Sequence, residues 1–215
     1  MKTTNDKLMI KNIIFDWSGV IKDCFESHVW SVGKMMEAFG GKPISKEELK
    51  NNWQQPYMDF WHKYFPNLTL EEEKKEYYET IGREDCPKSF SYPGITDLVK
   101  KLKEKDVFLA VVSSDSPKTL LPEMKDYGLE NVFKEVITDV HDKTEGVNRI
   151  LKDNNLDKTE TVFIGDSNHE IEVGKQAGIK TIAVTWGFTS EKELKSKNPD
   201  YLVHNIKELE NILLK

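Results

Sequence analysis

The sequence of 215 residues lacks long apolar runs and the cysteine pairs of a metal-binding motif. No segment approaches the roughly 20 apolar residues of a membrane-spanning helix, so we expect no membrane partner. The two cysteines, Cys24 and Cys86, allow at most one disulfide, and we interpret both as free thiols in a reducing compartment. The first residues, MKTTNDKLMI, contain neither the apolar core nor the small-residue cleavage site of a signal peptide. We therefore expect a cytoplasmic protein.

The chain also has no excess of basic residues: it contains 31 lysines and arginines and 37 aspartates and glutamates, which gives a formal net charge of −6. The charges are interspersed, and binding to a phosphate backbone needs a basic face, so we expect no nucleic-acid partner. A hydrophobic content of 38% with 32% charged residues is typical of a globular chain. The length suits one domain, or a core with a smaller insert, as a monomer or homodimer.

Short segments rich in β-forming residues alternate with helical patterns along most of the chain. Several of these segments are apolar throughout, as strands are when both faces of a parallel sheet are covered. The helical segments Thr96–Glu104 and Thr144–Asn154 each carry an apolar stripe on one face. The alternation predicts an α/β fold with a Rossmann-like parallel sheet. The expected strands are Ile10–Trp17, Val107–Val112, Glu135–Thr138, Thr161–Ile164, Lys180–Val184 and Tyr201–Val203.

Residues 23–92 interrupt this alternation, because they are helical in pattern and contain no convincing strand. The segment opens just after the first strand and closes at the Pro-Gly turn of Ser91–Ile95. We predict two units: a Rossmann-like core of residues 1–22 and 93–215, and an inserted all-helical cap of residues 23–92.

Two stretches of the cap have patterns of their own. Gln55–Phe65 repeats aromatic side chains at helical spacing, which favours packing inside the cap over a wall of a substrate pocket. The charged run Glu71–Glu76 is expected to be a solvated helix face.

Polar side chains follow the ends of the expected strands, where ligands bind in an open parallel sheet. Mg²⁺ prefers oxygen ligands, and Asp16 and Asp166 can supply them while Glu170 holds a coordinated water. The backbone carbonyl of Ser18 can complete the protein ligands. The metal would offset the repulsion between carboxylate and phosphate and leave one oxygen of Asp16 free to attack phosphorus.

Two further positions suit the phosphoryl group itself. Lys143 would neutralise charge on the transferring group, and the Ser113 hydroxyl would donate to its oxygens. Trp17 and Ser114 adjoin the strand ends and are expected to contact the substrate as well. Each residue alone has a simpler interpretation as a turn former, a helix cap or a surface group. Their joint occurrence, each after an expected strand, points to phosphoryl chemistry.

Together these residues make the chain similar to the haloacid dehalogenase-like (HAD) hydrolase superfamily, in the branch whose helical cap is inserted after the first motif. The resemblance spans nearly the whole chain and rests on Asp16–Val20, on LAVVSSD with Ser113, on Lys143 and on IGDSNHE with Asp166 and Glu170. It implies a Mg²⁺-dependent hydrolase of small phosphorylated metabolites. Asp16 would be the covalent nucleophile, Ser113 and Lys143 would bind the phosphoryl group, and Asp166 would bind the metal with help from Glu170.

Ser18 departs from this resemblance, because family phosphatases carry a second Asp two positions after the nucleophile. That Asp protonates the leaving oxygen and then activates water, which a serine hydroxyl cannot do at neutral pH. General acid–base help is worth about 10²–10⁴-fold in rate, so the change is too large to ignore. If the chain is a phosphatase, another acid has to stand in for efficient hydrolysis of alkyl esters. The candidates are Asp23, His28, Asp59 and His62.

Other functions stay open on the sequence alone. Family phosphonatases have a small residue at the position of Ser18 and form a Schiff base on a cap lysine, for which Lys22, Lys34 and Lys42 are available. A family member that binds a phosphorylated ligand without turning it over is a second alternative.

A response-regulator receiver uses similar groups but is shorter and has no helical insert, and dehalogenases lack the metal-binding Asp of the GD motif. His169 lies inside the last motif and is a further candidate for the pocket.

Overall fold

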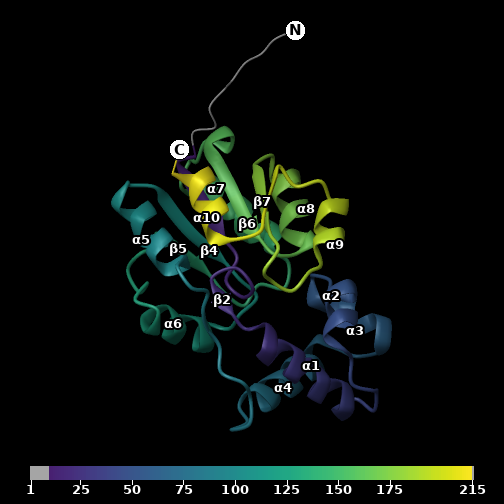
Figure 1. Ribbon diagram of the computed structural model, residues 1–215. Helices are drawn as coiled ribbons and strands as arrows, with labels where there is room; N and C mark the ends of the chain where they lie inside the picture. The colour runs from purple at the N-terminus through teal and green to yellow at the C-terminus, as the bar shows by residue number, and fades with distance from the viewer. Residues whose placement is uncertain (1–9, 215) are drawn as a thin grey trace.

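The computed structural model describes residues 10–214, and its parallel sheet has the strand order β5-β4-β1-β6-β7-β8 (Figure 1). The strands are β1 (Asn12–Phe15), β4 (Phe108–Val112), β5 (Glu135–Ile137), β6 (Thr161–Gly165), β7 (Lys180–Val184) and β8 (Tyr201–Val203). The predicted α/β class is confirmed, and every expected strand is present with its ends within two residues of the prediction. The N-terminal stretch that lacked a signal-peptide pattern lies, up to residue 9, outside the described residues.

The two-residue alternation of β1 divides its side chains between two cores. Ile13 and Phe15 face one cluster, which α5, α6 and α10 cover, whereas Ile14 faces the cluster that α7 and α8 cover. Because both faces are covered, all three side chains are fully buried. The helices are α5 (Ile95–Glu104), α6 (Pro117–Asp126), α7 (Lys143–Asp153), α8 (Asn168–Ala177), α9 (Glu191–Ser196) and α10 (Ile206–Leu213), with a 3-10 turn at Lys158–Glu160.

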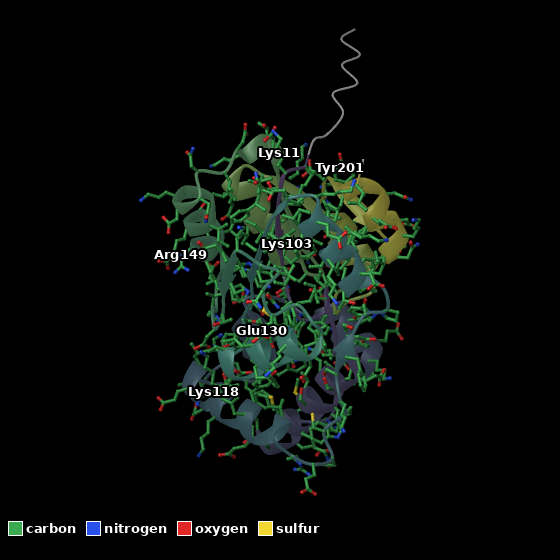
Figure 2. The ribbon with its side chains drawn as sticks, turned by 90° about the vertical axis from the view of Figure 1, so that its left-hand side faces the viewer. Lys11, Lys103, Lys118, Glu130, Arg149 and Tyr201 are labelled. Atoms are coloured by element: carbon green, nitrogen blue, oxygen red, sulfur yellow. The ribbon has the colours of Figure 1, made fainter. Side chains whose placement is uncertain are left out.

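Charged side chains cover the outside of the core. Lys118 and Arg149 are exposed, and Figure 2 shows them projecting away from the sheet. Within residues 10–214, no helix has the length and apolar character needed to cross a membrane.

The cap emerges from a small hairpin at the end of β1. In the hairpin, β2 (Lys22–Asp23) pairs antiparallel with β3 (Phe90–Ser91), so the chain leaves the core and returns to it at adjacent points. Sequence patterns indicated no strand here, because two-residue strands have no periodic signature. The cap helices between them are α1 (Phe25–Ala38), α2 (Lys46–Asn52), α3 (Tyr57–Tyr64) and α4 (Leu70–Ile81), which lie together below the sheet in Figure 1.

The cap has an apolar centre of its own. Phe60 and Trp61 of α3 are buried there with Met35 and Met36 of α1, as the helical spacing of the aromatic residues predicted. Phe188, from the core loop after β7, joins the same cluster. This contact seats the cap over the carboxyl ends of the strands.

The packing of helices on both faces of the sheet can be tested by replacing leucine with alanine at one buried and one exposed position. Leu109 on β4 is fully buried, whereas Leu121 on α6 is 49% exposed. Leu109→Ala should lower the free energy of unfolding by about 2–5 kcal/mol, because it leaves a cavity between packed layers. Leu121→Ala should change it by about 0.5 kcal/mol or less. Urea denaturation of both variants measures the difference, and equal losses would contradict the layer assignment.

Candidate functional site

Three strand ends meet at one edge of the sheet and bring the predicted polar residues together. Asp16 follows β1, Ser113 follows β4 and Asp166 follows β6, and these three strands are neighbours in the sheet. Parallel strands place their carboxyl ends on the same side, so residues far apart in sequence converge there. Lys143, the first residue of α7, completes the cluster.

The Lys143 ammonium lies between two carboxylates. Its Nζ is 2.8 Å from Oδ2 of Asp16 and 2.6 Å from Oε1 of Glu170. All three side chains are almost fully excluded from water. The other oxygen of each carboxylate is held as well: Oδ1 of Asp16 accepts from its neighbour's backbone N–H at 2.7 Å, and Oε2 of Glu170 accepts from the backbone N–H and hydroxyl of Ser167. These contacts fix both carboxylates in orientation.

The cluster carries more negative than positive charge, which shows in its pKa values. Burial raises the pKa of Asp16 to about 7, although Lys143 lowers it. Burial and the Asp16 charge raise the pKa of Asp166 well above its ordinary value. Burial also acts upward on Glu170, but the Lys143 ammonium outweighs it and brings that pKa to about 2. One ammonium therefore does not balance three buried carboxylates.

The same carboxylates fit a divalent cation. Asp16, Asp166 and Glu170 each offer an oxygen within 4.8 Å of the others. Oδ2 of Asp166 accepts from the backbone N–H of Phe188 at 2.6 Å, while Oδ1 is buried with no hydrogen-bond partner within the part of the chain that the structure describes. A buried oxygen without a partner is unfavourable, and a bound cation would satisfy it. The role of the Ser18 carbonyl as a further ligand stays a prediction.

Gly19 is needed beside these carboxylates for two reasons. Its φ of +82° is a left-handed conformation that favours glycine, and a Cβ atom there would lie 2.1 Å from Oδ2 of Asp166. The glycine of the first motif therefore lets the backbone approach the carboxylate closely.

Asp115 is a site residue that sequence reasoning missed. Its Oδ2 accepts hydrogen bonds from the Ser18 hydroxyl at 2.7 Å and from the Ser113 hydroxyl at 2.8 Å. It lines the same cavity as Asp16 and is partly exposed there. The only sequence signal was a third polar residue after β4, which also suits a helix start, because Ser116 caps α6. A carboxylate thus stands beside Ser18, supplied by another strand.

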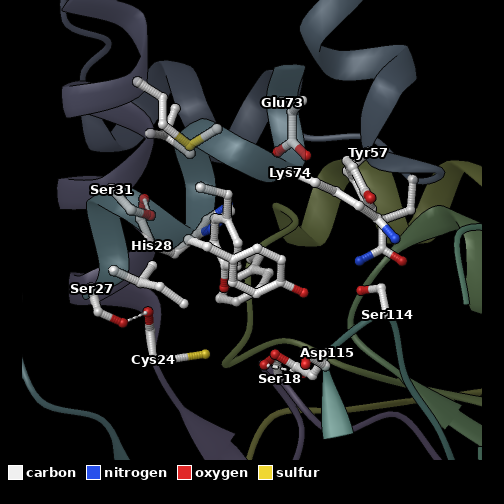
Figure 3. A pocket seen from close by; sticks show the side chains of 18 of the residues that line it. Ser18, Cys24, Ser27, His28, Ser31, Tyr57, Glu73, Lys74, Ser114 and Asp115 are labelled. Carbon is white, nitrogen blue, oxygen red and sulfur yellow. Dashed lines mark hydrogen bonds between the residues drawn. The ribbon is translucent and has the colours of Figure 1, made fainter. Parts of the chain in front are cut away.

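A cavity of about 120 Å³ separates the cap from the strand ends. Ser18 and Asp115 lie on the core side, while Tyr57, Glu73 and Lys74 enter from the cap, as Figure 3 shows. Ser114 also lines the cavity, as expected for a substrate contact. The cavity therefore has one wall that suits phosphoryl chemistry and another that can meet the rest of a substrate.

Three expectations about side chains need correction. The Trp17 indole is fully buried, donates to Oε2 of Glu123 at 2.9 Å and stacks on Tyr127, so it belongs to the core rather than the cavity. Within the charged run of α4, Glu73 is buried and not solvated. His169 is also buried; its Nε2 accepts from the backbone N–H of Lys143 at 3.3 Å, where it supports the start of α7 instead of facing substrate.

Among the proposed substitute acids, the structure brings His28 alone to the cavity. Its ring stacks on Phe188 with centroids 4.4 Å apart, and burial lowers its pKa to about 3. A proton donor at neutral pH needs a higher pKa than this. Asp23, Asp59 and His62 are exposed and lie outside the cavity lining.

Of the lysines considered for a Schiff base, Lys22 lines the cavity. Burial would lower its pKa, but the charges of Asp115 and Glu123 raise it above its ordinary value, and its Nζ lies 2.6 Å from Oε1 of Glu123. A lysine nucleophile must lose its proton, which these carboxylates oppose. Lys34 and Lys42 lie outside the cavity lining.

Comparison with known proteins agrees with the geometry. The profile of the family described as haloacid dehalogenase-like hydrolase matches residues 13–184. A phosphoglycolate phosphatase from Synechococcus elongatus is 24% identical over 202 residues, which cover 92% of this chain and 94% of that protein. The pyrophosphatase PpaX of Bacillus pumilus is 26% identical over 206 residues, which cover 93% and 94%. A solved structure described as a predicted phosphatase from Clostridium acetobutylicum has the same fold, with a TM-score of 0.82 at 21% identity over 96% of this chain and 99% of that one.

Metal binding can be tested without an activity assay. Saturating Mg²⁺ should raise the melting temperature of the protein by about 5 °C or more, because the cation neutralises buried carboxylates in the folded state only. Asp166→Asn should abolish this shift while leaving the metal-free protein at least as stable, since it removes a buried unpaired charge. Asp126→Asn, an exposed change on α6, should keep the full shift. A wild-type protein that does not respond to Mg²⁺, or a responsive Asp166→Asn variant, would contradict the assignment.

Proposed function

The chain belongs to the haloacid dehalogenase-like hydrolases, and we propose that it is a Mg²⁺-dependent phosphatase of small phosphorylated metabolites in the cytoplasm. The observation that carries this proposal is the Lys143 ammonium, held 2.8 Å from Asp16 and 2.6 Å from Glu170 next to a partnerless oxygen of Asp166. Two relatives are named as phosphatases of phosphoglycolate and of pyrophosphate, which supports phosphoryl transfer as the reaction class.

Asp16 is the nucleophile in this proposal. One of its oxygens forms a bond to phosphorus while the bond from phosphorus to the leaving oxygen breaks, and the electron pair goes to the leaving oxygen. Water then attacks the phosphorus of the aspartyl-phosphate, releases inorganic phosphate and restores the carboxylate. Lys143 orients Asp16 and balances charge on the phosphoryl oxygens. The Ser113 hydroxyl, which donates to Asp115 at 2.8 Å in this structure, turns to donate to the phosphoryl group when substrate binds.

Asp16, Asp166 and Glu170 are the proposed side-chain ligands of the metal, with the Ser18 carbonyl. When bound, Mg²⁺ supplies positive charge beside the phosphoryl oxygens. The support for this ligand set is the spacing of the three carboxylates and the unsatisfied oxygen of Asp166. Oxygen donors of this kind are those that Mg²⁺ prefers.

Asp115 stands in for the carboxylate that Ser18 lacks. It is supported in this role by its hydrogen bond of 2.7 Å to the Ser18 hydroxyl and by its partial exposure in the cavity. In the first step Asp115 transfers a proton to the leaving oxygen. In the second step its carboxylate takes a proton from the attacking water, so that each cycle returns it to its starting state.

The alternative of a phosphonatase has less support. A Schiff base needs a neutral amine in the cavity, and Lys22 is paired there with Glu123 at 2.6 Å. A family member that binds phosphate esters without turnover would give the Asp16 and Asp115 carboxylates no catalytic role.

The proposed function is tested by phosphate release from an aryl phosphate with and without Mg²⁺. We expect turnover that needs the metal and that Asp16→Asn abolishes, whereas Asp126→Asn leaves it unchanged. Metal binding without phosphate release from any ester would support the binding-only alternative. Hydrolysis of an aminoalkyl-aldehyde-type phosphonate, with a lysine adduct trapped by borohydride, would replace the proposal with a phosphonatase.

The role of Asp115 is tested by the leaving group. Asp115→Asn still accepts the hydrogen bonds of Ser18 and Ser113 but cannot transfer a proton. We expect turnover of alkyl phosphates to fall by about 10²–10⁴-fold. Turnover of an aryl phosphate should fall much less, because a good leaving group needs little protonation. An equal loss on both substrates would show that Asp115 acts on binding or folding instead.

A further inference from the structure

Glu73 is a buried carboxylate that phosphoryl transfer leaves unused. It projects from α4 and is 5% exposed, and its Oε1 accepts a hydrogen bond of 3.0 Å from Nε1 of Trp61. Within residues 10–214 it forms no ion pair, because the neighbouring Lys74 is engaged by Asp139 at 2.8 Å. Burial raises the pKa of Glu73 to about 7, although the Trp61 hydrogen bond and the charge of Lys74 lower it. A carboxylate in this state is stabilised by any cation that enters the cavity.

The charges around the cavity also favour a cation. Its lining contains four carboxylates and two ammonium groups. Both ammonium groups are already paired, Lys22 with Glu123 and Lys74 with Asp139. Lys143 lies next to Asp16 and is available to the phosphoryl end of a substrate. Glu73 is then the carboxylate of the cap side that has no ion pair within residues 10–214 and that a leaving group would meet.

Most of the aromatic rings that line the cavity come from the cap. Tyr57 and Glu73 project into it from the cap, opposite Ser18 and Asp115, as Figure 3 shows. Both residues line the cavity, and burial raises the pKa of Tyr57, as does the charge of Glu73. Aromatic faces beside a carboxylate attract alkylammonium groups through the ring quadrupole and the full charge together. The aromatic side chains in the lining are Trp53, Tyr57, Trp61, Tyr77, Tyr78 and Phe188.

We propose that the cap side of the cavity, built from Glu73 and the cap rings of this lining, binds an alkylammonium group on the leaving alcohol. The substrate class is then the phosphomonoesters of amino alcohols, including those with a quaternary nitrogen. This inference rests on the proposed phosphatase function and adds a substrate class to it. A leaving group with a carboxylate or a second phosphate would instead meet the charge of Glu73, so the preference differs from the substrates in the names of the two relatives.

A pair of isosteric esters tests the proposal. Phosphocholine and 3,3-dimethylbutyl phosphate have the same shape but differ by one positive charge. We expect wild-type kcat/KM to be about tenfold or more higher for phosphocholine, an effect of the size that a desolvated cation on aromatic rings and a carboxylate supplies. The Glu73→Gln side chain can still accept from the Trp61 indole. In this variant the ratio of kcat/KM for phosphocholine to kcat/KM for 3,3-dimethylbutyl phosphate should fall to about threefold or less, while 3,3-dimethylbutyl phosphate is still hydrolysed. Glu79→Gln, an exposed change on α4, should keep the wild-type ratio.

The possible outcomes distinguish a failure of the proposed ammonium site from a failure of the proposed phosphatase function. Absence of phosphate release from every ester, the aryl phosphate included, would overturn the phosphatase function itself. Hydrolysis of the aryl phosphate with a wild-type ratio of about one or less would overturn the ammonium site alone, whether or not Glu73→Gln folds. An unchanged ratio in a folded Glu73→Gln variant would also overturn it.

Discussion

The buried ammonium group of Lys143, placed between Asp16 and Glu170, is the contact on which the rest of the site depends. Parallel strands bring three carboxylates to one edge of the sheet, where burial makes their charges costly. The lysine orients two of them and lowers the pKa of Glu170, while the third, Asp166, keeps an oxygen without a partner among the described residues. The cluster is thus left short of positive charge, which is the condition under which a divalent cation and a phosphoryl group can be brought together.

The cap and the core each contribute one wall of the cavity. On the core side lie Asp16, the proposed nucleophile, and Asp115, which accepts a hydrogen bond from Ser18. The cap side supplies aromatic rings and Glu73, whose charge no lysine neutralises by an ion pair within residues 10–214. Phe188 packs into the cap cluster while its backbone N–H donates to Asp166, so one loop contacts both the cap and a proposed metal ligand.

The sequence indicated the sheet and the residues at its strand ends, because buried strands are apolar throughout and Asp16 and Asp166 come directly after them. Features that depend on tertiary packing were missed or misread. Asp115 was visible only as a third polar residue after β4, because its partner Ser18 lies 97 positions away. Glu73 looked solvated within a charged run, since only the packing of α4 against Trp61 buries it. Trp17 follows Asp16 directly in sequence, but its side chain is buried in the core, where it donates to Glu123.

Trapping the covalent intermediate tests the central claim most directly. The enzyme is mixed with a ³²P-labelled phosphomonoester and Mg²⁺, quenched in acid within the first turnover and digested for mass spectrometry. The account predicts protein-bound label that hydroxylamine releases and that maps to the peptide containing Asp16. Label on another residue, or rapid turnover with no label on the chain under conditions that preserve acyl phosphates, would contradict it.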